Sequence, residues 1–257
     1  MTVGWSAARA MAVREIRRFY RQPGRLIGAI GTPAVFWALL GGGFGHSLVV
    51  PGDGALRFFY PGMVLLTILF TAVFASLPVI EDRRGGFLRA ALVTPAPRAA
   101  LALGLAAGGA MVAAAQAAVL LLAARPLGYT VGPLGLAEAA AVCALLSVGC
   151  AALGVAAAWR AGTPQAYHAV MNVVLIPGWL LSGAVFPADG AQGWVRLMMQ
   201  VNPLSFAVAA IRQTLGDPPV AAGTAFASVT ANVVVLAAFA LLAVAWAAAE
   251  ARRTENS

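Results

Sequence analysis

Six apolar stretches, each about 20 residues long, constrain this chain more than any other feature of its sequence. They lie at residues 26–45, 58–80, 99–124, 138–159, 165–186 and 226–249. A helix needs about 20 mostly apolar residues to cross the hydrocarbon core of a bilayer. Only 10% of the residues are charged, against about 25% in a typical soluble domain. The sequence therefore predicts an all-α integral membrane protein with six transmembrane helices.

The distribution of basic residues predicts how these helices are oriented. All 17 basic residues are arginines. Four of them lie on one predicted side of the membrane, namely Arg57, Arg125, Arg196 and Arg212, and the other 13 lie on the opposite side. Because basic residues accumulate on the cytoplasmic side of membrane proteins, both termini are expected in the cytoplasm. The net charge of +8 is then explained by the excess of arginines on the cytoplasmic side, and nucleic acid is not expected as a partner.

Residues 1–25 form a predicted amphipathic connector helix. At 100° per residue, one arc of about 80° holds Trp5, Ala8, Ala12, Ile16 and Phe19. The opposite side carries a set of arginines: Arg14, Arg17, Arg18, Arg21 and Arg25. This pattern predicts a helix in the membrane interface, with its apolar side toward lipid and its guanidinium groups toward lipid phosphates. The alternative is a plain basic flank of the first span.

Two connecting segments of the predicted transmembrane domain, residues 26–249, are expected to contain helices of their own. Residues 81–98 combine a charged start, paired glycines, a short apolar helix and a proline stop, which suits a cytoplasmic contact with a partner. Residues 187–225 are too apolar for a free loop and predict two short helices that dip into the outer interface, separated by Asn202 and Pro203. Residues 250–257 are expected to form a cytoplasmic tail.

The side chains needed for most catalytic mechanisms are missing. Without lysine, the chain cannot contain a P-loop lysine or a Schiff-base lysine. No aspartate or glutamate falls in the middle of an apolar stretch, which argues against a proton- or sodium-coupled carrier. We therefore expect a non-catalytic membrane protein without a cofactor or metal ion of its own, whose energy source, if it does work, is another protein.

Four segments, in this order and spacing, resemble the membrane subunit of ABC type-2 exporters. The first is residues 14–19, similar to the end of the family's connector helix, and the second is Tyr60-Pro61-Gly62 at the start of a span. The third is residues 81–95, similar to a coupling segment, although Gly85-Gly86 and Arg89 replace the usual single glycine with a downstream acidic residue. The fourth combines Leu181-Ser182-Gly183-Ala184-Val185-Phe186-Pro187 with Asn202-Pro203-Leu204-Ser205-Phe206 and Arg212.

The resemblance implies specific partners. Two permease copies, identical or closely homologous, would pair with two separate ATP-binding-cassette ATPase subunits, which bind ATP and Mg²⁺. The ATPase would push on a helix whose apolar knob is Phe87 and Leu88. The remaining residues of the expected coupling surface are Glu81, Asp82, Arg83, Arg84, Gly85, Gly86 and Leu92. Such a chain would lie in the cytoplasmic (inner) membrane of a bacterium, among membrane lipid.

The resemblance also implies a substrate path between the second and fifth spans. The lining candidates are Thr67, Phe70, Thr71, Phe74, Asn172 and Leu175. An external cap would be formed by Pro187, Asn202, Pro203 and Arg212. Apolar walls favour the outward movement of a drug-like or lipid-like amphiphile. A polysaccharide or lipid-linked glycan exporter is the alternative within this class, and a non-transporting membrane scaffold or assembly protein is the alternative outside it.

Overall fold

The computed structural model of the protein describes residues 2–43, 54–85, 97–188, 191–217, 226 and 228–253. This part of the chain is helical and contains no strand, which confirms the predicted all-α class. The helices are α1 (Thr2–Tyr20), α2 (Pro23–Gly43), α3 (Ala55–Phe74), α4 (Leu77–Arg84), α6 (Arg98–Leu121), η1 (Arg125–Leu127), α7 (Pro133–Arg160), α8 (Pro164–Trp179), η2 (Leu180–Ala184), α9 (Gly193–Val201), α10 (Pro203–Thr214) and α11 (Val229–Arg253).

Five helical segments are long and apolar enough to cross a membrane. They are Ala55–Asp82, Arg98–Leu121, Pro133–Arg160, Pro164–Ala184 and Val229–Arg253, and they correspond to the second to sixth predicted spans. The first predicted span falls in α2, whose apolar part, Ile27–Gly43, is shorter than the others. Residues 44 and 45 of that predicted span lie outside the described residues.

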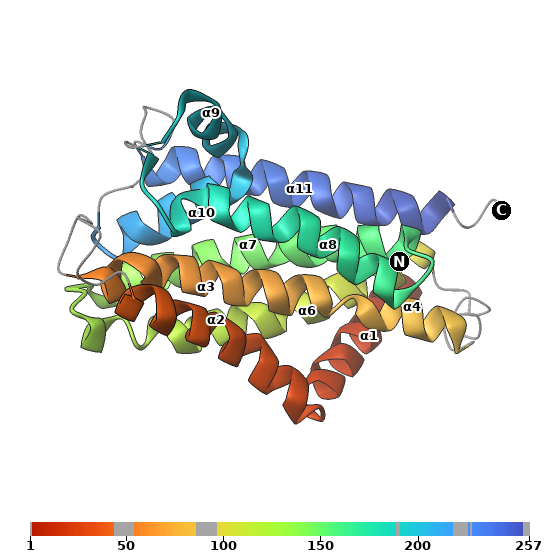
Figure 1. The fold of residues 1–257 in the computed structure, drawn as a ribbon. Coiled ribbons are helices and arrows are strands. Elements are labelled where there is room, and N and C mark those ends of the chain that lie inside the picture. The colour runs from red at the N-terminus through yellow and green to blue at the C-terminus, as the bar shows by residue number, and fades with distance from the viewer. Residues whose placement is uncertain are drawn as a thin grey trace.

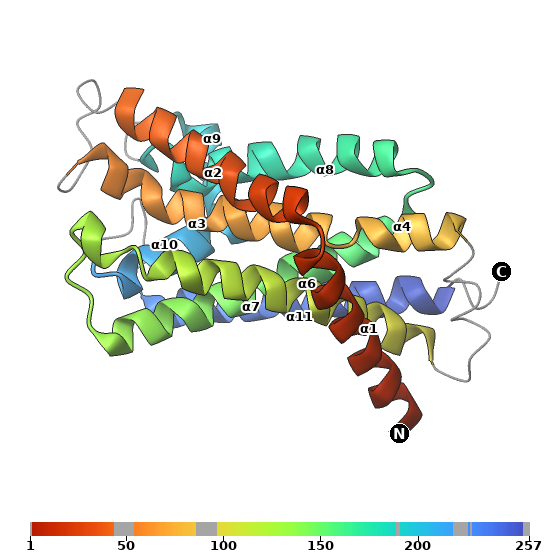
Figure 2. The same ribbon diagram turned by 90° about the horizontal axis from the view of Figure 1, so that it is seen from below.

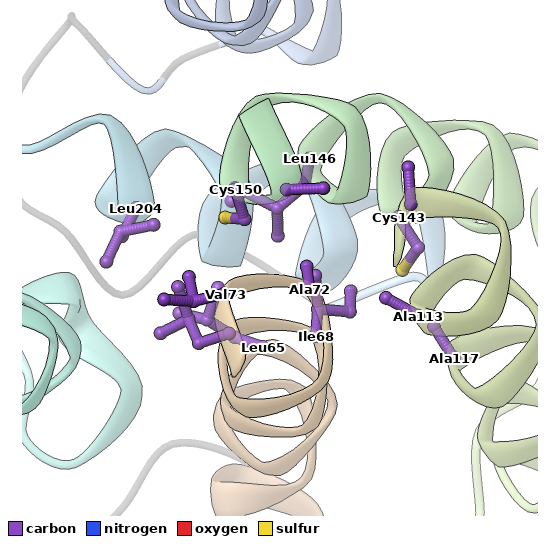
Figure 3. Packing of buried hydrophobic residues seen from close by; sticks show 14 of the residues in the cluster. Leu65, Ile68, Ala72, Val73, Ala113, Ala117, Cys143, Leu146, Cys150 and Leu204 are labelled. Atoms are coloured by element: carbon purple, nitrogen blue, oxygen red, sulfur yellow. The ribbon is translucent and has the colours of Figure 1, made fainter. Parts of the chain in front are cut away.

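The long helices form a bundle in which α7 packs against α6 and α11, and α3 packs against α6 and α7 (Figures 1 and 2). Helix α4 and the C-terminal end of α11 lie at one end of the bundle, which we call the α4 end. Helices α9 and α10 lie toward the opposite end, the α10 end. In the core, Ala113 and Ala117 of α6 approach Cys143 of α7 beside α3 (Figure 3). Such small side chains let neighbouring helix backbones come close together.

Helix α1 packs across α6 rather than standing apart from the bundle. A Cβ atom at Gly108 would lie 2.9 Å from the carbonyl oxygen of Ala12, so only glycine permits this crossing. Ala12 and Phe19 are buried, whereas Trp5 is 76% exposed. The predicted apolar arc is therefore divided: most of it faces protein and not lipid, because the small residues of α6 offer it a closely fitting surface.

The predicted pair of short helices before the last span is present as α9 and α10. The two helices are bent by 80° at Asn202 and Pro203, as the asparagine–proline pair predicts. Helix α10 packs against α3, α7 and α11 and is buried along most of its length. Helix α10 is therefore part of the bundle core at the α10 end, while α9 lies on the outside (Figure 1).

Candidate functional site

The expected coupling segment begins on α4, directly after a break that follows α3. Glu81 and Asp82 occupy the last turn of α4, and Gly85 is its C-cap. Of the other predicted coupling residues, Gly86, Phe87, Leu88 and Leu92 lie outside the described residues. The side chains of Arg83 and Arg84 also lie outside the described part of the structure. The coupling role of the segment stays a prediction.

Two arginines of α1 bind the acidic residues of α4. Arg14 forms an ion pair with Asp82. Arg18 donates to Oε2 of Glu81 over 2.7 Å and lies 3.4 Å from Oδ1 of Asp82. The side chain of Asp82 is only 12% exposed, so this network is better shielded from water than an ordinary surface pair. We call these four residues the α1–α4 ion-pair network. It joins two regions that the sequence assigned to different partners, lipid and ATPase.

An open cleft of about 430 Å³ lies beside this network. Its lining residues come from α1, the link between α1 and α2, α2, α3, α4 and α8: Phe19, Gln22, Gly28, Ala29, Phe70, Thr71, Phe74, Leu77, Pro78, Glu81, His168 and Asn172. We call it the α3/α8 cleft. It brings together four of the six predicted path residues, namely Phe70, Thr71, Phe74 and Asn172.

The cleft presents an aromatic wall and a few polar groups. The ring of Phe74 lies 5.5 Å from that of Phe70 and 4.8 Å from that of His168. Thr71 donates its hydroxyl proton to the side chain of Gln116 on α6, so its oxygen is fixed in the wall. Asn172 is exposed on α8. Aromatic faces with a small number of placed polar groups are typical of sites for molecules with an apolar body.

The structure separates Thr67 and Leu175 from the cleft. Both are buried, and the Thr67 hydroxyl donates to the carbonyl of Met63 over 3.0 Å. Sequence reasoning missed His168 as a lining residue, although it lies one helical turn before Asn172 and so shares its face. The contributions of Phe19 and Ala29 depend on the fold of α1 and α2 against α3, and no local sequence signal marks them.

The Tyr60-Pro61-Gly62 motif gives the start of α3 its contacts with other helices. Proline has no N–H, so the carbonyl of Arg57 lacks its usual helical donor. The hydroxyl of Tyr129 replaces that donor at 2.8 Å. Burial raises the pKa of Tyr129, and the carboxylate of Asp217 raises it further, so this hydroxyl keeps its proton and donates.

The end of α8 lies against the same motif. The indole N–H of Trp179 donates to the carbonyl of Gly62 over 2.9 Å. A Cβ atom at Gly62 would lie 2.7 Å from the Cβ atom of Ala184 in η2. Gly183 has a φ of 77°, which glycine adopts without strain. The motifs at the start of α3 and at the end of α8 therefore form one packed junction.

Asn202 connects this junction to α10. Its side-chain oxygen accepts from the backbone N–H of Leu204 over 3.0 Å, and its amide donates to the carbonyl of Gly178 over 2.7 Å. Ser205 donates to the carbonyl of Leu181 over 3.1 Å. The two halves of the fourth resemblance segment, separated in sequence, are thus hydrogen-bonded to each other.

Arg212 is a buried structural residue at the α10 end. It is 2% exposed, donates to the carbonyl of Phe58 over 2.6 Å, and stacks over the Phe58 ring at 4.5 Å. The nearby pair of Arg57 and Asp217, 2.6 Å apart, ties α3 to the end of α10. Of the other proposed cap residues, Pro187, Asn202 and Pro203 are partly buried. These contacts hold the segment in place, and an external cap function stays a prediction.

Comparison with known proteins identifies the class of this chain. Residues 6–215 match the ABC-2 type transporter family, and the chain belongs to this family. It is a multi-pass membrane protein of the transport permease type. Membership implies pairing with an ATP-binding-cassette subunit. The family resemblance inferred from the four sequence segments is thereby confirmed.

Two curated relatives are similar over most of their length. The protein named "Putative transport permease ycf38" of Cyanophora paradoxa is 28% identical over 197 residues, which cover 75% of this chain and 68% of the relative. The protein of the same name from Porphyra purpurea is 26% identical over 210 residues, which cover 79% of this chain and 72% of the relative.

Proposed function

We propose that this chain is the permease subunit of an ATP-driven exporter in the cytoplasmic membrane of a bacterium. Membership of the ABC-2 type transporter family carries this proposal. Two permease copies pair with two separate ATPase subunits, which bind ATP and Mg²⁺. Both termini lie in the cytoplasm, and the ATPase docks at the α4 end, where residues 81–98 begin.

The proposed substrate is a drug-like or lipid-like amphiphile that moves outward from the cytoplasm or the inner leaflet. The α3/α8 cleft supports this substrate class because it places the rings of Phe70 and Phe74 beside polar groups of His168 and Asn172. Such walls offer a free ion few ligands, whereas the apolar part of an amphiphile would gain binding free energy by leaving water for the cleft. Glu81 is one of the lining residues, so the cleft lies close to the coupling segment and substrate would enter there.

The decisive measurement is ATP hydrolysis by this chain reconstituted with its ATPase in liposomes. An amphiphilic substrate should stimulate hydrolysis, and Phe74→Ala should remove the stimulation because it takes away the central ring of the cleft wall. Phe87→Ala with Leu88→Ala should remove coupling while leaving membrane insertion intact. Trp194→Ala with Leu197→Ala, on the exposed face of α9, is the matched control.

Other outcomes would assign another function. Stimulation by lipid-linked glycans, with none by amphiphiles, would identify a glycan exporter. Unchanged coupling in the Phe87 and Leu88 variant would refute the coupling role of that segment. A chain that binds no ATPase and transports nothing would be a membrane scaffold, and the proposal would fail.

A further inference from the structure

The C-terminal half of α1 forms one wall of a strongly basic groove. This groove is lined by Arg14, Arg17, Arg18, Arg21, Gln22 and Asp82 and has a volume of about 670 Å³. Four guanidinium groups therefore face one carboxylate. The spacing explains the cluster, because residues three and four apart lie on the same side of a helix.

The four arginines divide into two pairs with different surroundings. Arg14 and Arg18 are held by the acidic residues of α4. Arg17 and Arg21 are exposed, and in the part of the chain that the structure describes no carboxylate lies within 4.0 Å of either. The α1–α4 ion-pair network thus holds two of the four arginines of the groove, while the exposed guanidinium groups of Arg17 and Arg21 keep their charge available to a ligand. Guanidinium groups match the oxygens of phosphate in charge and in geometry.

The surroundings of the groove indicate that such a phosphate belongs to a lipid. Helix α1 ends at Tyr20, and after two further residues the apolar helix α2 begins at Pro23. Tyr20 is 57% exposed and Ile27 is 70% exposed, so exposed aromatic and aliphatic side chains lie on either side of Arg21 in the chain. Arginines beside exposed aromatic and aliphatic side chains are characteristic of a membrane interface. An acidic protein surface would not need this apolar continuation.

We propose that this groove binds the phosphate group of an anionic phospholipid, with Arg17 and Arg21 as its principal donors. The acyl chains then extend along the exposed apolar surface that begins at Tyr20. This site adjoins the α3/α8 cleft, with which it shares Gln22, but its binding of lipid does not depend on the transported substrate or on ATP hydrolysis.

The test is a lipid titration of the full-length protein in detergent, followed by native mass spectrometry. Phosphatidylglycerol should bind more tightly than phosphatidylcholine. In Arg17→Gln with Arg21→Gln, phosphatidylglycerol should bind about 25-fold more weakly, since each arginine near a lipid surface contributes about fivefold. Arg252→Gln with Arg253→Gln removes the same charge from the same end of the bundle, and this control should retain the affinity of the unmodified protein.

Three results would overturn the proposal. Equal affinity of the groove variant and the control for phosphatidylglycerol would show that the lipid binds elsewhere. Displacement of phosphatidylglycerol by inorganic phosphate at the same concentration would identify a site for free phosphate. Loss of ATPase binding in the groove variant, with unchanged lipid affinity, would identify the groove as a protein interface. Both substituted side chains are exposed, so an unchanged thermal unfolding midpoint should accompany the expected loss.

Discussion

The hydroxyl of Tyr167 on α8 lies 2.7 Å from Oγ of Ser76, inside the break between α3 and α4. The same hydroxyl donates to the carbonyl of Val73 over 2.9 Å. A Cβ atom at Gly154 of α7 would lie 2.9 Å from the carbonyl oxygen of Val73, and the Tyr167 hydroxyl lies 3.3 Å from the carbonyl oxygen of Gly154. The carbonyl of Val73 near the end of α3 thus accepts from Tyr167 of α8 as well as from the backbone N–H and the hydroxyl of Ser76, and both α7 and α8 pack beside the break.

Replacement of Tyr167 by phenylalanine should destabilise the protein without changing its fold. The ring remains, but the hydrogen bonding of the hydroxyl to the carbonyl of Val73 and to Ser76 is lost, which costs about 1 kcal/mol in a membrane protein. The unfolding midpoint in detergent should fall by several degrees. Tyr20→Phe, at an exposed position, is the matched control and should leave the midpoint unchanged. A midpoint equal to that of the unmodified protein would mean that Ser76 satisfies Val73 alone.

Loss of the α1–α4 ion-pair network should make α4 open more readily. Arg14→Gln with Arg18→Gln removes both cations that bind Asp82, so amides in residues 77–85 should exchange hydrogen for deuterium faster. Arg17→Gln with Arg21→Gln removes the same charge from α1 and the residue that follows it but no described ion pair. Exchange in α4 should stay unchanged in that control. Equal acceleration in both variants would indicate a general charge effect rather than release of α4.

Local sequence patterns predicted the helices well because each depends on short-range chemistry. Runs of apolar residues located the spans, and Asn202 with Pro203 located the bend before α10, since the asparagine caps a helix that proline can start. The α3/α8 cleft was partly predicted through the family resemblance, which placed Phe70, Phe74 and Asn172 on the walls of a path between the second and fifth spans.

Tertiary partners were not predictable from the same patterns. By composition, the arc of α1 that contains Ala12 and Phe19 could face either lipid or protein. It faces protein because Gly108 of α6 has no side chain and lets Ala12 approach closely. Arg212 was assigned to an external cap because of the resemblance to ABC type-2 exporters, which carries no information on its burial. Its burial depends on the carbonyl of Phe58, which lies 154 positions away in the chain.

Arg212 should be required for stability because it donates a hydrogen bond to the buried carbonyl of Phe58 at the α10 end. Arg212→Met removes the donor to the carbonyl of Phe58 and should cost about 3 kcal/mol, since hydrogen bonds from charged groups are the stronger ones. The unfolding midpoint in detergent measures this loss. Arg125→Met, at an exposed position of the same end, should change the midpoint little. A variant as stable as the control would show that the burial of Arg212 is energetically neutral.

The contact between Gly62 and η2 should tolerate no side chain. In Gly62→Ala the new methyl group would lie 2.7 Å from the Cβ atom and 2.9 Å from the carbonyl oxygen of Ala184, so the start of α3 and the end of α8 must separate. Separation also lengthens the hydrogen bond from Trp179 to Gly62. We expect a loss of about 2 kcal/mol, measured as a lower unfolding midpoint. The matched control is Gly42→Ala, where nothing lies within 4 Å of the added atom; alanine is the better helix former, so this variant should be at least as stable as the unmodified protein. Equal midpoints for the two variants would show that α3 and η2 can move apart at Gly62 without a loss of stability.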